Sequence, residues 1–434
     1  MSNYRGSFLR TTVLAIIVAT LSLLLAIVVL SSSGQTVAAR SLFLLFSLLC
    51  LALASLAALV ALGGIISLRR DALERAGRPY FSPTPRERSP GFMTRLRRLV
   101  LSLLSGSRSQ LGLWPGEWAR VRPFPEIAAT LDENGRLDGL PFMPEMLPYC
   151  GARLRVFRRI DKFHDYFTPA GTGMRRVRDA VALGDLRCNG GGHGGCQAGC
   201  LFTWKEAWLE PVNGPEADAP PPAIRASRLE EFACRTSPEG VTRYSCQLTE
   251  LPKAAALMWW NDPRHYLRSL WSGNVQFVPF VKAVALALFN IVQTKTRSPT
   301  APHQEDGIPE TGVLPPLNLQ PGDIVRVKSR QEIAKTLKKS RNSGLSFDAM
   351  EMNRFCGGEF RVAKRVETIV DEASGRMLTM KSPSIVLDGV SSGGEYRGLY
   401  PQNELIFWRE VWLERVGKAP DVALQAVEAS AELA

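Results

Sequence analysis

A run of thirteen residues in the middle of the chain holds three thiols and one imidazole. It reads Cys188-Asn-Gly-Gly-Gly-His193-Gly-Gly-Cys196-Gln-Ala-Gly-Cys200. Zinc in proteins prefers thiolate sulfur and imidazole nitrogen, and closed sets of four Cys, or of three Cys and one His, form structural zinc sites. The intervening glycines let the backbone curl at little steric cost, so that nearby side chains converge on one ion. The run therefore predicts a metal site, with zinc as the expected ion.

A fourth thiol, that of Cys150, is expected to complete the site, because an internal repeat places it on the adjoining core segment. We predict that the metal is held by Cys150, Cys188, Cys196 and Cys200, with His193 as a substitute ligand or a supporting group. The run lacks the paired C-x2-C knuckles of common zinc motifs. An iron–sulfur cluster, which Cys thiolates also hold, is therefore the alternative. Buried structural cysteines or a redox dithiol are the interpretations without a metal.

Other chemistry at these residues has weaker physical support. Cys196 as a nucleophile with His193 as its base would make a hydrolase, but catalytic partners normally come from different elements of a fold. The glycines at 190, 192 and 195 match the spacing of a dinucleotide fingerprint, yet no hydrophobic strand leads into them. Cys234 and Cys246 form a second half-site or, more simply, pack as small hydrophobic side chains. The sequence favours metal binding over catalysis.

The chain beyond residue 110 contains an internal repeat. Matching blocks recur at offsets of 204 to 206 residues. They pair 115–121 with 321–327, 126–131 with 332–337, 139–142 with 344–347, 145–156 with 351–362 and 204–210 with 408–414. We therefore predict two copies of one module, over 111–212 and 319–416. At offset 204 the three cysteines of the run fall on Ser392, Tyr400 and Glu404, so the second copy is not expected to hold a metal.

Each copy has the pattern of a small antiparallel β structure. Residues 322–328 and 360–366 alternate apolar with polar side chains, as half-buried strands do, and 369–381 is typical of a hairpin. Residues 332–336 are expected to form one helical turn, whereas 408–414 fits either a strand or a helix, because its two Trp are spaced i, i+4. The predicted fold class is α+β, with two tandem SH3-like antiparallel barrels and a helical insert between them.

Glu206 and Glu410 stand between paired Trp residues at equivalent positions of the two copies. Their presence in both copies favours a structural salt bridge over an acid–base role, because only one copy carries the cysteine run. We predict Arg120 and Arg326 as the respective partners.

Pro- and Gly-rich stretches on both sides bracket the insert, which is predicted to be helical over 224–296. Within it, Asp262 before Pro263 is typical of a helix N-terminus. Residues 275–295 are almost wholly apolar, which favours a buried core helix, with an interfacial or partner-facing helix as the alternative. Residues 417–434 are expected to form a frayed tail.

Two apolar segments without charge, 11–30 and 41–68, precede the repeat. Because roughly 20 apolar residues suffice to cross a bilayer, we predict a membrane hairpin over 1–70. A signal peptide is the alternative for the first segment. Arg residues flank both outer ends of the hairpin, whereas its loop holds only Arg40, so both ends are expected in the cytoplasm and the protein in a bacterial inner membrane. Thiols in that reducing compartment more often bind metal than form disulfides.

The formal net charge of +12 is concentrated near the predicted membrane segments. Residues 69–108 hold ten Arg against three acidic side chains. We interpret 71–110 as a basic linker and 69–108 as a stretch that attracts anionic lipid headgroups. Nucleic-acid binding would require a basic stripe with stacking aromatic residues on a folded face. No such segment stands out, so no nucleic-acid partner is expected.

Four stretches read MRRVRD, HGGCQAGCL, WKEAWL and FWREVWLERV, at 174–179, 193–201, 204–209 and 407–416. In these motifs the chain resembles, over 113–416, a bacterial family of proteins to which no activity is assigned. In similar chains the second module also carries several Cys, near Ser384, Ser391 and Gln402 of this sequence. The departure at these positions argues against a second metal site here.

Together these features predict a membrane-anchored, cytoplasm-facing zinc adaptor or scaffold that binds a protein partner through its tandem modules. The alternative is a membrane-bound enzyme that uses the same cysteines, either as an iron–sulfur redox protein or as a Cys-dependent hydrolase. The scaffold is favoured because no convincing catalytic constellation accompanies the anchor and the duplicated module.

Overall fold

The computed structural model describes nine stretches of the chain. They are 52, 55–66, 112–165, 173–214, 227–258, 264–295, 316–338, 340–394 and 399–418. The chain divides into two compact units, one made of 1–76 and 277–302 and the other of 77–276 and 303–434. The predicted membrane segment 11–30 and most of 41–68 lie outside the described residues, as does the predicted linker. No helix among the residues described is both long and apolar enough to cross a membrane.

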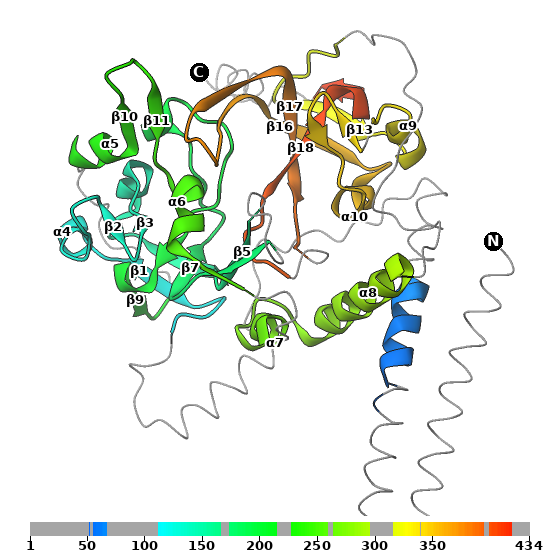
Figure 1. Ribbon diagram of the computed structural model, residues 1–434, viewed down its shortest axis with the longest axis horizontal. Coiled ribbons are helices and arrows are strands. Elements are labelled where there is room, and N and C mark those ends of the chain that lie inside the picture. Colours follow the sequence, from blue (N-terminus) through cyan, green and yellow to red (C-terminus); the bar gives the residue numbers. More distant parts are fainter. Residues whose placement is uncertain are drawn as a thin grey trace, which may run out of the picture. The chain divides into compact units, whose positions relative to one another are not determined.

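The first sheet region contains five antiparallel strands in the order β8-β7-β4-β1-β9 (Figure 1). These strands are β1 (Trp118–Val121), β4 (Arg153–Arg159), β7 (Ala180–Leu183), β8 (Trp204–Lys205) and β9 (Leu209–Val212). Strand β7 is buried along its whole length. It belongs to an apolar core that also contains Met146, Trp204 and Trp208. Burial of such large side chains supplies most of the free energy that holds a module together.

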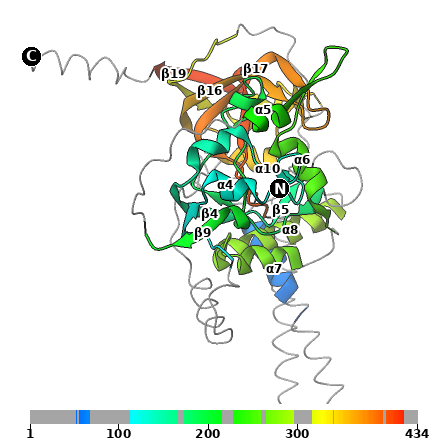
Figure 2. The ribbon, with the colours of Figure 1, turned by 90° about the vertical axis from the view of Figure 1, so that its left-hand side faces the viewer.

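The second sheet region repeats the first strand by strand, in the order β18-β17-β16-β13-β19. Its strands are β13 (Asp323–Val327), β16 (Glu359–Val370), β17 (Met377–Ser391), β18 (Leu405–Arg409) and β19 (Leu413–Lys418). In Figure 2 these strands lie above those of the first region. The prediction of a mixed α+β fold with two similar antiparallel sheet regions is therefore confirmed.

Short elements connect the strands within the two regions. In the first they are α4 (Phe124–Ala128), β2 (Arg136–Leu137), β3 (Leu140–Pro141), η2 (Pro144–Tyr149), β5 (Lys162–His164), β6 (Met174–Arg176) and η3 (Gly191–His193). In the second they are α9 (Arg330–Ala334), β14 (Arg341–Asn342), β15 (Leu345–Ser346), α10 (Ala349–Met352) and η5 (Asn353–Phe355). Helix α9 confirms the predicted helical turn, and the pairing of β16 with β17 confirms the hairpin predicted over 369–381.

The Trp-rich segment that closes each copy is neither one strand nor one helix. A single 3₁₀ turn, η4 (Glu206–Trp208) or η6 (Glu410–Trp412), interrupts the strands on either side. The turn directs the second Trp of each copy into the core, where Trp208 and Trp412 are fully buried. Each indole N–H then donates to a threonine hydroxyl, to Thr130 at 3.1 Å in the first copy and to its equivalent at 2.9 Å in the second. The i, i+4 spacing of the two Trp residues fitted both a strand and a helix, and the segment contains strands with one helical turn between them.

The ion pairs of the two copies match, although not as predicted. They are Arg159–Glu206 and Arg120–Glu210 in the first copy, and Arg365–Glu410 and Arg326–Glu414 in the second. Glu206 and Glu410 do form structural salt bridges, but the predicted partners Arg120 and Arg326 are wrong. The antiparallel register of β1 and β9 sets Arg120 opposite Glu210. Glu206 lies earlier in the chain, at the start of the 3₁₀ turn η4.

The region between the copies is only partly helical. It contains α5 (Ser227–Ala233), β10 (Cys234–Thr236), β11 (Thr242–Tyr244), α6 (Gln247–Ala254), β12 (Ala256–Leu257), α7 (Arg264–Trp271) and α8 (Phe277–Lys295). Helix α8 belongs to the other compact unit, where it packs against the helix over 55–66 (Figure 1). A Cβ on Gly63 would lie 2.2 Å from the Ala285 carbonyl oxygen, so this close packing needs glycine. The predicted N-terminus at Asp262-Pro263 lies outside the described residues.

Candidate metal centre

The cysteine run forms a closed loop between β7 and β8. The Cys188 N–H donates to the Cys200 carbonyl oxygen at 2.9 Å and closes the loop. Inside it, Gly190 has a φ of 76°, and a Cβ at this position would lie 2.0 Å from the Cys196 carbonyl oxygen. Only glycine fits such a left-handed position in contact with backbone. The prediction that glycines let the run curl on itself is borne out at this residue.

His193 is buried in this loop and bonded to a carboxylate that sequence reasoning missed. Its Nδ1 lies 2.6 Å from Oε1 of Glu145, which also accepts the Gly192 N–H at 2.9 Å. The exposed fraction of His193 is 1%. Its Nε2 is buried without a hydrogen-bond partner among the described residues. A carboxylate that orients one ring nitrogen and leaves the other for a ligand is the usual arrangement at histidine metal sites.

Cys188 lies beside this pair. Its sulfur is 3.6 Å from Oε1 of Glu145, and the ligand atoms of Glu145, Cys188 and His193 all lie within 4.8 Å of one another. This spacing allows the three residues to hold one metal ion. Glu145 was not a predicted ligand, although the matched block that holds Cys150 also holds Glu145 and its equivalent Glu351.

The charges of this trio favour a cation. Burial raises the pKa of Glu145, but the hydrogen bond and charge of His193 outweigh it and hold the pKa below its usual value. Burial also raises the pKa of Cys188, and the Glu145 carboxylate beside it raises it further. A divalent cation reverses this second effect, because metal coordination stabilises the thiolate.

Four thiols line one small cavity next to His193. The cavity measures about 20 Å³, and its lining includes Cys188, Cys196, Cys200 and Cys246. A space of ~10–15 Å³ by this measure admits a single water molecule, so the cavity has room for about one water-sized species and is too small for an organic ligand. The predicted residues Cys188, His193, Cys196 and Cys200 are thus brought together.

The thiols in this cavity are close enough to affect one another's ionisation. Burial raises the pKa of Cys200 well above its usual range, and the thiols of Cys246 and Cys188 raise it further. Burial raises the pKa of Cys246 to about 11, with Cys196 contributing to the rise. Such mutual opposition is expected wherever thiols that share a buried site have no cation between them.

Cys246 lines the cavity, whereas Cys150, which was expected there, does not. Cys246 caps α6, and the adjacent Gln247 exchanges two hydrogen bonds with the backbone of Thr203, each at 2.8 Å, which holds Cys246 beside Cys200. Cys150 is buried in the core of the first sheet region, where burial raises its pKa to about 11, and it does not line the cavity. Cys234, on β10, does not line it either.

The loop also contacts the second sheet region. The Val370 N–H, at the end of β16, donates to the Cys196 sulfur at 3.3 Å. The next residue, Gln197, donates its N–H to the Thr368 carbonyl oxygen at 2.9 Å, and its side-chain oxygen accepts the Glu367 N–H at 2.6 Å. The cysteine loop is therefore joined to β16 by one backbone–backbone hydrogen bond and by hydrogen bonds to the Gln197 and Cys196 side chains.

In the described residues of the second copy, the equivalent closing hydrogen bond is present with different side chains around it. The Ser392 N–H donates to the Glu404 carbonyl oxygen at 2.8 Å, as Cys188 does to Cys200 in the first copy. The Tyr400 hydroxyl lies 2.8 Å from the Ser392 hydroxyl and 3.1 Å from the Glu404 carboxylate. These are the three residues that the offset of 204 aligns with the cysteines, so hydrogen bonds hold the second loop where thiols converge in the first.

The arrangement favours ligation over nucleophilic catalysis at Cys196. His193 directs Nδ1 to Glu145, and the Cys196 sulfur already accepts a backbone N–H from another strand. The glycines at 190, 192 and 195 lead into an irregular loop and then β8, without the helix N-terminus that a dinucleotide phosphate requires. Comparison with protein-family models, with curated proteins and with solved structures finds no match for this chain.

Proposed function

We propose that this protein is a zinc-binding scaffold, in which one ion is held by Cys188, Cys196, Cys200 and Cys246. The observations that support the proposal are that these four thiols, from two distant segments, line one small cavity, and that the ligand atoms of Glu145, Cys188 and His193 beside it lie within 4.8 Å of one another. Four thiolates around one ion make a closed structural zinc site. The His193–Glu145 pair stands next to it, either as support or with His193 replacing one thiolate.

Zinc suits the cavity better than an iron–sulfur cluster. Four Cys ligands also hold such clusters, but a cluster contains several iron and sulfide atoms, and the cavity of about 20 Å³ has room for about one water-sized species. The N–H groups of Gly190 and Val370 each approach a sulfur, those of Cys188 and Cys196, at 3.3 Å. Backbone donors of this kind support thiolates that carry negative charge around a metal.

The expected effect of the metal is to join separate parts of the fold. Its ligands come from the loop between β7 and β8 and from the start of α6. The same loop contacts β16 through Cys196 and Gln197. Metal bonds that close long stretches of chain stabilise the folded state strongly, because the unfolded chain has no preformed site. The ion would thus fix α6 against the cysteine loop, which in turn contacts β16 through hydrogen bonds.

The wider role of this scaffold is proposed from the sequence. The hairpin predicted over 11–30 and 41–68 would tether it to a bacterial inner membrane with both ends in the cytoplasm. The basic stretch 69–108 would lie against anionic headgroups. We further propose that the two sheet regions are SH3-like modules that present a surface to a protein partner. Their equal strand order supports a duplicated module of this size.

Metal analysis tests the proposal directly. The full chain, purified in mild detergent without chelator or oxygen, is expected to be colourless and to contain one zinc per chain. Cys246→Ser should lose most of that zinc, whereas the matched control Cys234→Ser should retain it, because Cys234 does not line the cavity. Near-UV circular dichroism verifies that each variant folds.

Three results would overturn the proposal. A visible charge-transfer band with bound iron would favour a redox protein. Metal-free protein with one hyper-reactive thiol would favour a Cys-dependent hydrolase. Full zinc occupancy in a folded Cys246→Ser variant would show that the fourth ligand lies elsewhere.

A further inference from the structure

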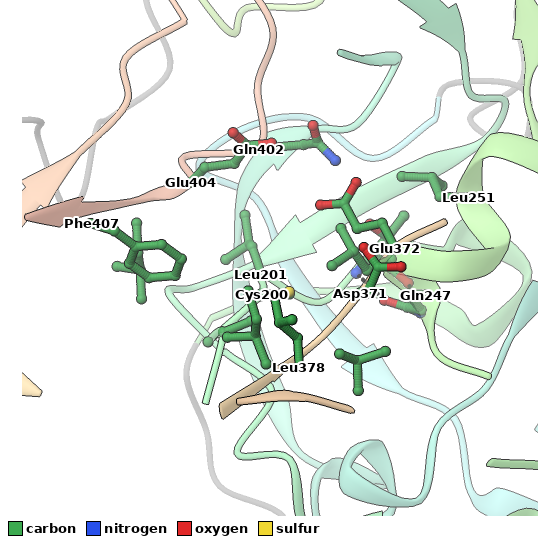
Figure 3. Close-up of a pocket in the computed structure, with 17 residues that line it drawn as sticks. Cys200, Leu201, Gln247, Leu251, Asp371, Glu372, Leu378, Gln402, Glu404 and Phe407 are labelled. Carbon is green, nitrogen blue, oxygen red and sulfur yellow. Dashed lines mark hydrogen bonds between the residues drawn. The ribbon is translucent and has the colours of Figure 1, made fainter. Parts of the chain in front are cut away.

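A second, larger cavity lies beside the proposed metal site (Figure 3). It measures about 250 Å³ and is lined by loop residues 198–203, by α6, by the end of β16 with the turn after it, and by 402–407. The segments 198–203 and 402–407 are equivalent in the repeat, at offset 204. The cavity is therefore formed where the same segment of the two copies meets, with α6 closing it.

Most of the wall of this cavity is apolar. The aliphatic and aromatic side chains that line it include Leu201, Leu248, Leu251, Leu378, Leu405 and Phe407. Such walls favour the apolar body of an organic molecule over a hydrated ion, because they offer no hydrogen bonds to replace its water. The volume is near the lower end of the range of small-molecule sites, ~300–1,000 Å³.

The polar groups in the wall are mainly acceptors. Figure 3 shows the side-chain ends of Glu404, Gln402 and Glu372 along one side of the cavity, with Asp371 next to Glu372. Among the described residues, Oε1 of Gln402 is buried with no hydrogen-bond partner, and the Glu372 carboxylate lies beside it in the same wall. No residue of the described lining is basic.

Three carboxylates in a partly buried wall without a cation repel one another. Burial raises the pKa of Glu372 to about 8, and the carboxylates of Glu404, Asp371 and Asp165 contribute to the rise. Asp371 is occupied by Ser374, whose N–H and hydroxyl donate to it at 2.9 Å and 2.5 Å. Glu404 accepts the Tyr400 hydroxyl. Glu372 and Gln402 remain as the acceptors that face a ligand.

We propose that this cavity binds a small organic cation, namely a primary amine on a compact apolar body. Its ammonium group would donate to Glu372 and Gln402, and its body would pack against the leucine and phenylalanine side chains. Charge complementarity selects the cation, since an acceptor-rich wall offers nothing to an anion. The apolar walls select the organic molecule over a metal ion. This cavity adjoins the thiol cavity, and Cys200, Leu201 and Gln247 are among the residues that line both.

Isothermal titration of the full, zinc-loaded chain with benzylamine tests the proposal. Benzyl alcohol, which has nearly the same shape without the charge, is the reference ligand. Binding of benzylamine is expected, with at least about tenfold weaker binding of the alcohol, because a charged hydrogen bond is lost. Glu372→Gln should weaken benzylamine binding by a similar factor. Glu239→Gln, which changes an exposed carboxylate elsewhere, is the matched control.

Filling the cavity gives a second test that does not touch the carboxylates. Leu378 lines the cavity and is half-exposed, so Leu378→Trp introduces bulk there with little risk to folding. It should abolish benzylamine binding, whereas Leu257→Trp, at a site of similar exposure outside the cavity, should not. Equal affinity for benzyl alcohol, unchanged benzylamine binding in Glu372→Gln, or no benzylamine binding at all would overturn the proposal. Saturable Ca²⁺ binding in place of benzylamine would overturn it in favour of an inorganic cation.

Discussion

The described parts of the cysteine loop in the first module and of its counterpart in the second share backbone features but not a chemistry. In both, a backbone hydrogen bond closes the loop, and a glycine with positive φ, Gly190 or Gly394, packs on backbone at the same place. The side chains on this frame are thiols in one copy and a hydroxyl, a phenol and a carboxylate in the other. The backbone therefore brings the three positions together, and the residue types decide whether hydrogen bonds or a metal join them.

This difference gives the two modules different sources of stability. In the second module the Tyr400 hydroxyl satisfies its neighbours within the loop itself. In the first, buried thiols raise one another's pKa and gain little from each other. Their convergence becomes favourable once a cation is present. We therefore expect the first module to respond to metal and the second to be nearly indifferent to it.

The largest expected effect is that of removing the metal. Chelation of the full chain should destabilise the first module by at least about 3 kcal/mol, because structural zinc sites contribute much of the folding free energy of small modules. Hydrogen exchange followed by mass spectrometry is expected to show faster exchange in β7 and β8, with β17 and β18 little changed.

Hydrogen exchange of the Cys196→Ser variant distinguishes the loss of a metal ligand from other effects of the chelator. Loss of this thiolate should reproduce the effect of chelation on the first module. Equal acceleration of exchange in both modules would contradict a local metal site, and an unchanged pattern would contradict a structural one.

Alanine at the paired glycines should affect both modules alike. A Cβ at Gly190 or Gly394 would lie 2.0 or 2.3 Å from a backbone carbonyl oxygen, and both residues have left-handed φ. Each substitution should therefore cost about 2–4 kcal/mol of unfolding free energy in its own module. Gly389→Ala is the control, because it shares the positive φ but has open space around its Cβ. Denaturant unfolding checks the values. A similar cost at Gly389 would show that conformation alone, rather than the close contact, matters.

Glu145 and its equivalent Glu351 should differ in their effect on the metal. Glu145→Gln removes a carboxylate that bonds to His193 and lies beside Cys188, and it is expected to lower zinc affinity by roughly 10–100-fold. Competition with a chromophoric chelator measures the change. Glu351→Gln should leave zinc affinity unchanged, since the second loop carries no thiols. Equal losses in the two variants would mean that they act through folding rather than through His193.

The sequence allowed the repeat and two residues of the possible metal group, Cys188 and His193, to be predicted, whereas Glu145 was missed. Glycine spacing and clustered thiols are local signals, and the constant offset aligned Cys196 with Tyr400 before any contact was known. The position of Cys246 beside the cavity could not be predicted, because it depends on how α6 docks through Gln247. Cys150 does not line the cavity, because it is buried in the core of the first sheet region instead. Long-range packing of this kind leaves no periodic trace in a single sequence.

The smallest expected effect tests the second loop by itself. Tyr400→Phe removes one hydroxyl that bonds to both Ser392 and Glu404, and it leaves the buried ring in place. The second module should lose about 1–2 kcal/mol, the cost of leaving buried acceptors unsatisfied, while zinc content and the exchange of β7 stay unchanged. Urea unfolding and metal analysis check these outcomes. A larger loss that also lowers zinc occupancy would show that the two loops are coupled through the shared cavity. The two loops would then be halves of a single site, rather than two loops that are stabilised independently.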